Sequence, residues 1–98
     1  MAYRSRIRAW RNGDAVVFRL DIAATYTLYE ILIEETDVGS SPPEDSFFLK
    51  VEVNPVGLAD SHEQVDLWKE FTLKDPTGLV NKICFHFEGE WDMVTVDT

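Results

Sequence analysis

Alternation of apolar and polar residues dominates this chain and predicts β-strands, because side chains two positions apart share one face of a strand. Over residues 3–10, arginines take most of the positions on one face and mainly apolar residues take the other. The pair Asn12-Gly13 follows, and Asn-Gly is typical of a type I′ hairpin turn, which needs positive φ at both central positions. The return strand is expected over residues 15–20, where one face is wholly apolar.

The same alternation marks two later segments. Residues 47–54 and residues 80–88 both place apolar side chains on one face and mainly polar side chains on the other. The first of these strands is expected to end at Pro55, since proline cannot donate a hydrogen bond to a strand ladder. Gly89 allows a turn after the second, so a last strand is expected over residues 91–96.

The segments between these strands carry mixed signals. Residues 25–35 have leucine and isoleucine at helical spacing, but their β-branched and aromatic content favours a strand. Residues 36–46 hold two prolines, a glycine and several acids, which predicts an exposed acidic loop. Residues 60–71 have the serine and glutamine spacing of a helix capping box and could begin with a short helix, although residues 67–73 could equally form a strand. Residues 75–78, Asp-Pro-Thr-Gly, have the composition of a type I turn and predict a further hairpin.

Together these segments predict a mainly β fold. Six to seven short strands with at most one short helix describe a single antiparallel β-sandwich or small barrel. The 98 residues suit one domain, because two cores would each bury too little apolar surface to fold alone.

Charge is the strongest compositional signal, and it is unevenly distributed. The chain has 18 acidic against 9 basic residues and a net charge of −9. Residues 1–19 nevertheless contain five arginines and one aspartate. An acidic surface repels nucleic acid and anionic membranes and attracts basic partners, so a protein with a basic surface is the expected partner. The candidate acidic binding surface comprises Glu34, Glu35, Asp37, Glu44, Asp45, Glu88, Glu90 and Asp92.

The N-terminal hairpin is a second candidate surface. Guanidinium groups bind carboxylates and phosphates bidentately, and an aromatic side chain closes the row. The residues of this basic hairpin are Arg4, Arg6, Arg8, Trp10 and Arg11. Residues 8–16 also resemble the Trp-x-Asn-x-x-Ala-Val stretch of MazE-type antitoxins, whose basic hairpins bind DNA. The resemblance implies nucleic-acid binding, although the arginine expected after the valine is displaced to Arg19 and no proline follows.

The sequence gives little support for catalysis or for a cofactor. Cys84, His86 and Glu88 share one strand face, but neighbours on such a face are about 6.6 Å apart and do not converge on a metal ion. No phosphate loop, metalloprotease motif or dinucleotide fingerprint is present. A single cysteine excludes an internal disulfide, and no apolar run reaches the about 18 residues of a membrane span. We therefore expect a cytoplasmic protein that is not an enzyme and uses no metal or cofactor.

The functional expectation is a small acidic protein-binding module. In composition the chain resembles phage-encoded inhibitors and nuclease immunity proteins, which occupy basic, nucleic-acid-binding sites of other proteins. One alternative is a structural or assembly subunit of a homo-oligomer or virion, and another is nucleic-acid binding through the arginine hairpin. Trp68 and Trp91 are expected to pack in the core, and the less favoured alternative is that they are exposed and stack on sugar rings in a lectin-like site.

Overall fold

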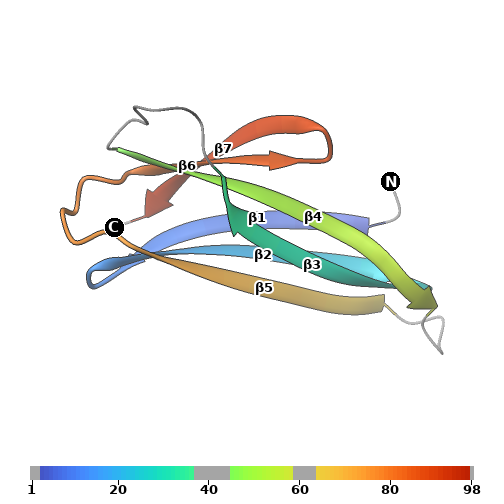
Figure 1. Ribbon diagram of the computed structural model, residues 1–98. Coiled ribbons are helices and arrows are strands. Elements are labelled where there is room, and N and C mark those ends of the chain that lie inside the picture. Colours follow the sequence, from blue (N-terminus) through green and yellow to red (C-terminus); the bar gives the residue numbers. More distant parts are fainter. Residues whose placement is uncertain (1–2, 37–44, 59–63, 98) are drawn as a thin grey trace.

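The computed structural model describes residues 3–36, 45–58 and 64–97 (Figure 1). These residues form strands and contain no helix. The seven strands are β1 (Tyr3–Asn12), β2 (Ala15–Thr25), β3 (Thr27–Glu35), β4 (Ser46–Leu58), β5 (Gln64–Lys74), β6 (Lys82–Phe87) and β7 (Glu90–Asp97).

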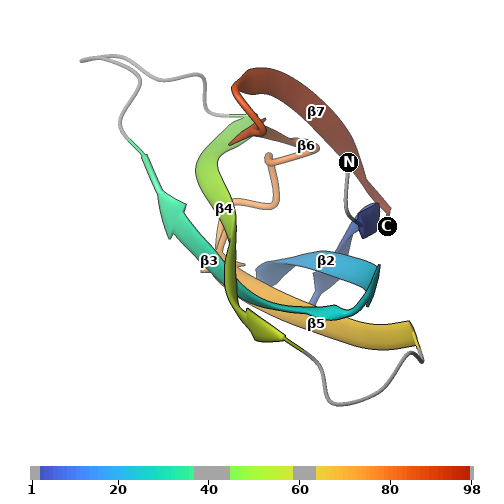
Figure 2. The ribbon, with the colours of Figure 1, turned by 90° about the vertical axis from the view of Figure 1, so that its right-hand side faces the viewer.

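The strands form one curled sheet in the order β3-β4-β6-β7-β1-β2-β5. Four neighbouring pairs are antiparallel, whereas β4 with β6 and β1 with β7 are parallel. The edge strands β3 and β5 contact each other, and seen end-on the strands surround a common interior (Figure 2). The sheet is therefore nearly closed into a small barrel, which confirms the predicted fold class and adds that the sheet is mixed.

The interior is filled by the apolar face of each strand, as the alternation predicts. Phe18, Leu20, Leu49 and Ile83 are completely buried and come from three different strands. The rings of Phe18 and Phe85 lie 5.5 Å apart and join the two halves of the sheet. Burial of side chains of this size contributes about 1.5 to 3 kcal/mol each, so this one cluster is the main source of stability.

The predicted hairpin of β1 and β2 is confirmed, but its turn is not the type I′ turn expected at Asn12-Gly13. Asn12 pairs with Ala15, so Gly13 and Asp14 are the central turn residues. Gly13 has φ of 65° and Asp14 is not among the described residues with positive φ, which is the φ pattern of a type II′ turn. At the β6–β7 turn, Glu88 and Gly89 both have positive φ, of 55° and 81°, as type I′ requires.

Two strands are longer than expected. Residues 25–35 are extended: β2 continues to Thr25, and Tyr26, with φ of 70°, forms the corner into β3. Strand β4 passes Pro55 and ends at Leu58, with a register shift between Leu28 and Tyr29 on β3. Proline is tolerated there because this part of β4 pairs only with β3, which leaves its other edge without a ladder to interrupt.

Two local predictions have different outcomes. Of the alternatives left open after residue 60, the strand over residues 67–73 is confirmed as part of β5, while the proposed capping serine lies outside the described residues. The turn at residues 75–78 does form, since the Gly78 amide donates to the Asp75 carbonyl at 3.2 Å. It does not connect a hairpin, because β5 pairs with β2 while β6 pairs with β4 and β7.

Candidate functional site

The barrel wall is incomplete between β1 and β7. Within the described residues, these strands pair only at Ala9 with Val96 and at Trp10 with Asp97. Towards the other end of β1 they separate, and the β6–β7 hairpin stands away from β1 (Figure 1). A groove of about 430 Å³ opens there, and we call it the β1–β7 groove. It is lined by Ser5, Ile7, Phe85, Phe87, Glu88, Glu90 and Asp92.

Strand register explains why acidic side chains line this groove. Asp92 is paired with Phe85 and Glu90 with Phe87, so both acids occupy positions on the inner face of the sheet. In a closed barrel these positions would face the apolar core. Here β1 is displaced, and both carboxylates are exposed above an apolar floor that includes Ile7.

Tyr3, at the start of β1, contacts Phe87 and Glu88 beside the groove. Its ring lies 5.1 Å from that of Tyr29 and 6.5 Å from that of Phe87. Its hydroxyl donates a hydrogen bond of 2.5 Å to Oε1 of Glu88. Burial raises the pKa of the Tyr3 phenol, and the hydrogen bond to the negative Glu88 raises this pKa further. Tyr3 is therefore a neutral donor that links β1 to the β6–β7 turn.

The acids of the groove have no cationic partner within the described part of the chain. None of Glu88, Glu90 and Asp92 takes part in an ion pair there. One oxygen of Asp92 accepts a hydrogen bond of 2.8 Å from the amide of Met93. The groove therefore presents negative charge that the described residues of the protein do not neutralise.

The other predicted acids lie elsewhere. Glu34 and Glu35 end β3 and are separated from the groove by β4 and β6. Asp45 lies next to β4, with its carboxylate 3.9 Å from the Lys82 ammonium group. Asp37 and Glu44 lie outside the described residues. The structure thus brings together the three acids from the end of the chain and places them apart from Glu34, Glu35 and Asp45.

The outer face of the β6–β7 hairpin carries an apolar patch, where the sequence offered an exposed Trp91 only as the less favoured alternative. Trp91 and Met93 are 54% and 53% exposed, so the prediction that Trp91 packs in the core was wrong. With Phe48, Cys84 and Asp92 they line a hollow of about 440 Å³, and we call Phe48, Cys84, Trp91 and Met93 the Trp91 patch. The Trp91 ring also lies 5.3 Å from that of His86. The sequence signal for the exposure of Trp91 and Met93 is strand alternation, because Val94 and Val96 face inward and residues 91 and 93 take the opposite face.

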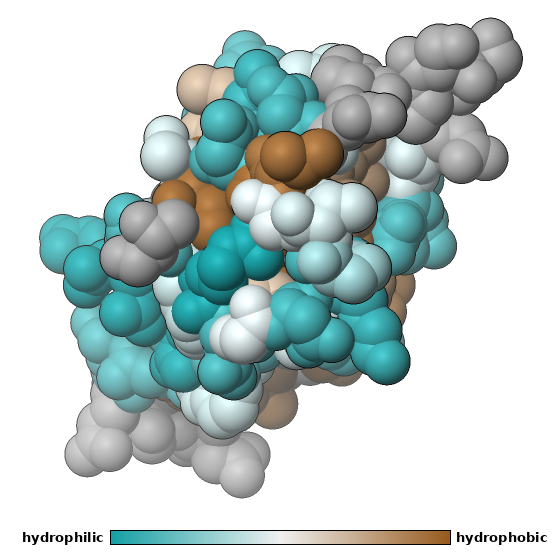
Figure 3. Space-filling view, turned by 90° about the vertical axis from the view of Figure 1, so that its left-hand side faces the viewer, coloured by the Kyte–Doolittle hydropathy of each residue, from teal (hydrophilic) through white to brown (hydrophobic). Residues whose placement is uncertain are grey.

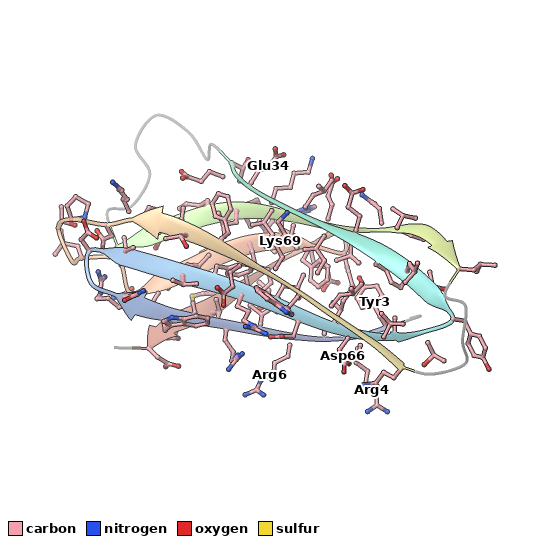
Figure 4. The ribbon with its side chains drawn as sticks, turned by 90° about the horizontal axis from the view of Figure 1, so that it is seen from below. Tyr3, Arg4, Arg6, Glu34, Asp66 and Lys69 are labelled. Carbon is pink, nitrogen blue, oxygen red and sulfur yellow. The ribbon has the colours of Figure 1, made fainter. Side chains whose placement is uncertain are left out.

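The arginine stripe lies on the outer face of β1, and Figure 4 shows Arg4 and Arg6 projecting away from the barrel. Arg8 is 3.6 Å from Asp21, and its guanidinium carbon lies 5.8 Å from the centre of the Trp10 ring. Arg8 therefore interacts with the protein's own surface residues Asp21 and Trp10.

Arg19 neutralises much of the remaining charge on this face. It binds both carboxylate oxygens of Asp21 at 2.9 to 3.1 Å and Glu70 at 3.3 Å. The hydrogen bonds from Arg19 hold the pKa of Asp21 below its usual value. Trp68 is 59% exposed, contrary to expectation, and Arg19 stacks 4.5 Å from its ring centre. On the β1–β2–β5 face, Arg8, Arg19, Asp21 and Glu70 are therefore paired with one another, whereas Arg4 and Arg6 form no ion pair with the described residues.

Arg11 has a different role from the rest of the stripe. It points to the opposite face, where its Nη2 donates to Oδ2 of Asp75 at 2.7 Å and to the Val80 carbonyl at 2.9 Å. This end of the barrel, where β1 and β7 do pair, exposes mostly hydrophilic residues around a small apolar area (Figure 3). Arg11 thus fixes the connection between β5 and β6 to the barrel.

The described residues bear on three further features: a metal site, the single cysteine and a membrane-spanning helix. Among residues 3–36, 45–58 and 64–97, no group of three or more His, Cys, Asp or Glu side chains is placed to hold a metal ion. The Cys84 thiol is free and half-buried. Within the same residues no helix has the length and apolarity to cross a membrane.

Comparisons with protein-family models, with curated proteins and with solved structures found no match. The similarity of residues 8–16 to MazE-type antitoxins therefore has no family match behind it. The protein is defined by its fold, an all-β chain whose mixed sheet is nearly closed into a small barrel.

Proposed function

We propose that this protein is a small, non-catalytic binding module that receives a basic segment of a partner protein in the β1–β7 groove. The observation that carries the proposal is the inward placement of Glu90 and Asp92 above an apolar floor, without a cation from the described chain. Carboxylates beside apolar surface match the ammonium or guanidinium head and the aliphatic stem of a lysine or arginine.

The charge of the whole chain supports the same kind of partner. A net charge of −9 attracts a basic protein over a distance of roughly 8 Å in physiological salt. Electrostatic attraction of this kind mainly raises the association rate, so binding should weaken as salt is added. A partner whose basic segment normally contacts nucleic acid would be inhibited by this binding, which is the narrower inhibitor hypothesis.

The test is a matched pair of variants with equal loss of charge. Glu90→Gln with Asp92→Asn removes the groove acids, while Glu30→Gln with Asp66→Asn removes two exposed acids outside it. The probe is a labelled peptide of about ten residues that alternates lysine and valine, measured by fluorescence anisotropy. The groove variant should lose at least about tenfold in affinity, and the control should stay within about twofold of the unmodified protein.

Two outcomes would overturn the proposal. Equal weakening in both variants would show that the peptide responds only to overall charge. Failure of the unmodified protein to bind, together with self-association of the groove variant, would show that Glu90 and Asp92 instead keep the edge of β7 from pairing with other copies.

A further inference from the structure

Strand β7 has a free edge along most of its length. Between Glu90 and Thr95 it pairs with β6 on one side only, and its other edge has no strand partner in the described part of the chain. This free edge of six residues is about 20 Å long at the usual rise of a strand. Unpaired backbone groups along a sheet edge are a template on which an extended segment of another protein can form an additional strand.

The two faces of this edge differ in chemistry. The inner face presents Glu90 and Asp92, which belong to the β1–β7 groove. The outer face presents Trp91 and Met93, which belong to the Trp91 patch. Successive side chains of an added strand point to opposite faces. One alternate set would therefore meet carboxylates, and the other would meet aromatic and thioether surface.

We propose that the partner segment binds as an added β-strand along the free edge of β7 and that its sequence alternates basic and apolar residues. This inference rests on the proposed function and names the chemistry of the partner. Charge complementarity selects basic side chains for the inner face, and the exposed Trp91 and Met93 select apolar side chains for the outer face. The bound segment completes the part of the barrel wall where β1 and β7 have separated.

Backbone methylation tests the strand pairing separately from the charge. Two versions of the alternating lysine and valine peptide carry backbone N-methyl groups at every second residue. One version is methylated at the lysines and the other at the valines. N-methylation removes donors on one edge of the peptide and keeps every side-chain charge. An added strand predicts that one version loses at least about tenfold in affinity while the other still binds.

The Trp91 patch is tested by a second matched pair. Trp91→Ala should weaken binding of the lysine and valine peptide by about tenfold, because a central tryptophan commonly dominates such a contact. Trp68→Ala is the control, since Trp68 is 59% exposed but lies on β5, away from this edge. A lysine and serine peptide, which keeps the charge and lacks the apolar set, should bind the unmodified protein about as weakly as the parent peptide binds Trp91→Ala.

The outcomes separate this inference from the proposed function. Equal binding of both methylated peptides, with no effect of Trp91→Ala, would overturn strand addition and leave the basic groove in place. No binding of any lysine peptide would overturn both. A dimer of the protein alone, dissociated by Trp91→Ala, would also overturn the inference, because a second copy would then occupy the edge.

Discussion

The two ends of the barrel are built in opposite ways. At the closed end, β1 and β7 are paired, and Asp75 is only 5% exposed. Its carboxylate accepts hydrogen bonds from Arg11, Thr77 and the Val80 amide, at 2.7, 2.8 and 3.1 Å. At the open end the strands have separated, and one hydrogen bond from Tyr3 to Glu88 links β1 with the β6–β7 turn.

The difference lies in how each end accommodates its carboxylates. A buried carboxylate is tolerated only when its oxygens are hydrogen-bonded, and Asp75 meets this condition fully. The groove acids are exposed and therefore retain their hydration. Charge at the closed end is satisfied within the fold, while charge at the open end is not, which is the basis of the proposed binding there.

The largest expected effect is the loss of stability when the ion pair at the closed end is removed. Asp75→Asn removes the charge that Arg11 binds and leaves a buried guanidinium contact without its anion. We expect a loss of about 2 to 4 kcal/mol in the free energy of unfolding, measured by urea denaturation. The control is Asp45→Asn, because the carboxylate of Asp45 is 48% exposed and lies 3.9 Å from Lys82. A surface pair of this kind contributes about 0 to 1 kcal/mol, so equal losses in the two variants would refute the structural role of Asp75.

A smaller effect is expected in the way the contribution of Asp75 to stability changes at low pH. Hydrogen bonds from Arg11, and then from Thr77 and Val80, hold the pKa of Asp75 below its usual value despite burial. A depressed folded-state pKa contributes stability that is complete above the unfolded-state pKa of about 4 and is lost as pH falls through the folded-state pKa. The stability difference between the unmodified protein and Asp75→Asn should therefore be constant near neutral pH and narrow in strong acid. A difference that begins to narrow well above about pH 5 would contradict the lowered pKa.

Much of the fold could be predicted from local patterns. Alternation identified the strands that contain Phe18, Leu49 and Phe85, because a residue's face depends only on its immediate neighbours. The parallel pairings of β4 with β6 and β1 with β7 could not be predicted, since they join segments far apart in the sequence. The turn at residues 75–78 misled for the same reason: its aspartate serves Arg11, 64 positions away, and closes no hairpin.

The candidate site was predictable only in part. Acidic density drew attention to Glu88, Glu90 and Asp92, but the groove depends on the separation of β1 from β7, which no local pattern reports. Arg11 was grouped with the arginine stripe because of its position in the chain. Arg11 lies three positions after Arg8, so its side chain is on the face opposite to Arg4, Arg6 and Arg8. Strict alternation would therefore have separated Arg11 from these three arginines.

The smallest expected effect is the loss of stability when the hydrogen bond between Tyr3 and Glu88 at the open end is removed. Tyr3→Phe keeps the ring contacts with Tyr29 and Phe87 and removes the hydrogen bond to Glu88. We expect a loss of about 1 kcal/mol in the free energy of unfolding near neutral pH. Tyr29→Phe is the matched control, because it changes a neighbouring ring and leaves the Tyr3 hydroxyl in place.

The raised pKa of Tyr3 sets the pH range of this contribution. A folded-state pKa above the unfolded value of about 10 gives stability that is complete below pH 10 and is lost as pH rises, because the unfolded phenol ionises first. The difference between the unmodified protein and Tyr3→Phe should therefore shrink only in strong alkali, whereas the Asp75 difference shrinks only in acid. If Tyr3→Phe proved as destabilising as Asp75→Asn, the open end would be as tightly held as the closed one, and its groove could not be free to admit a partner.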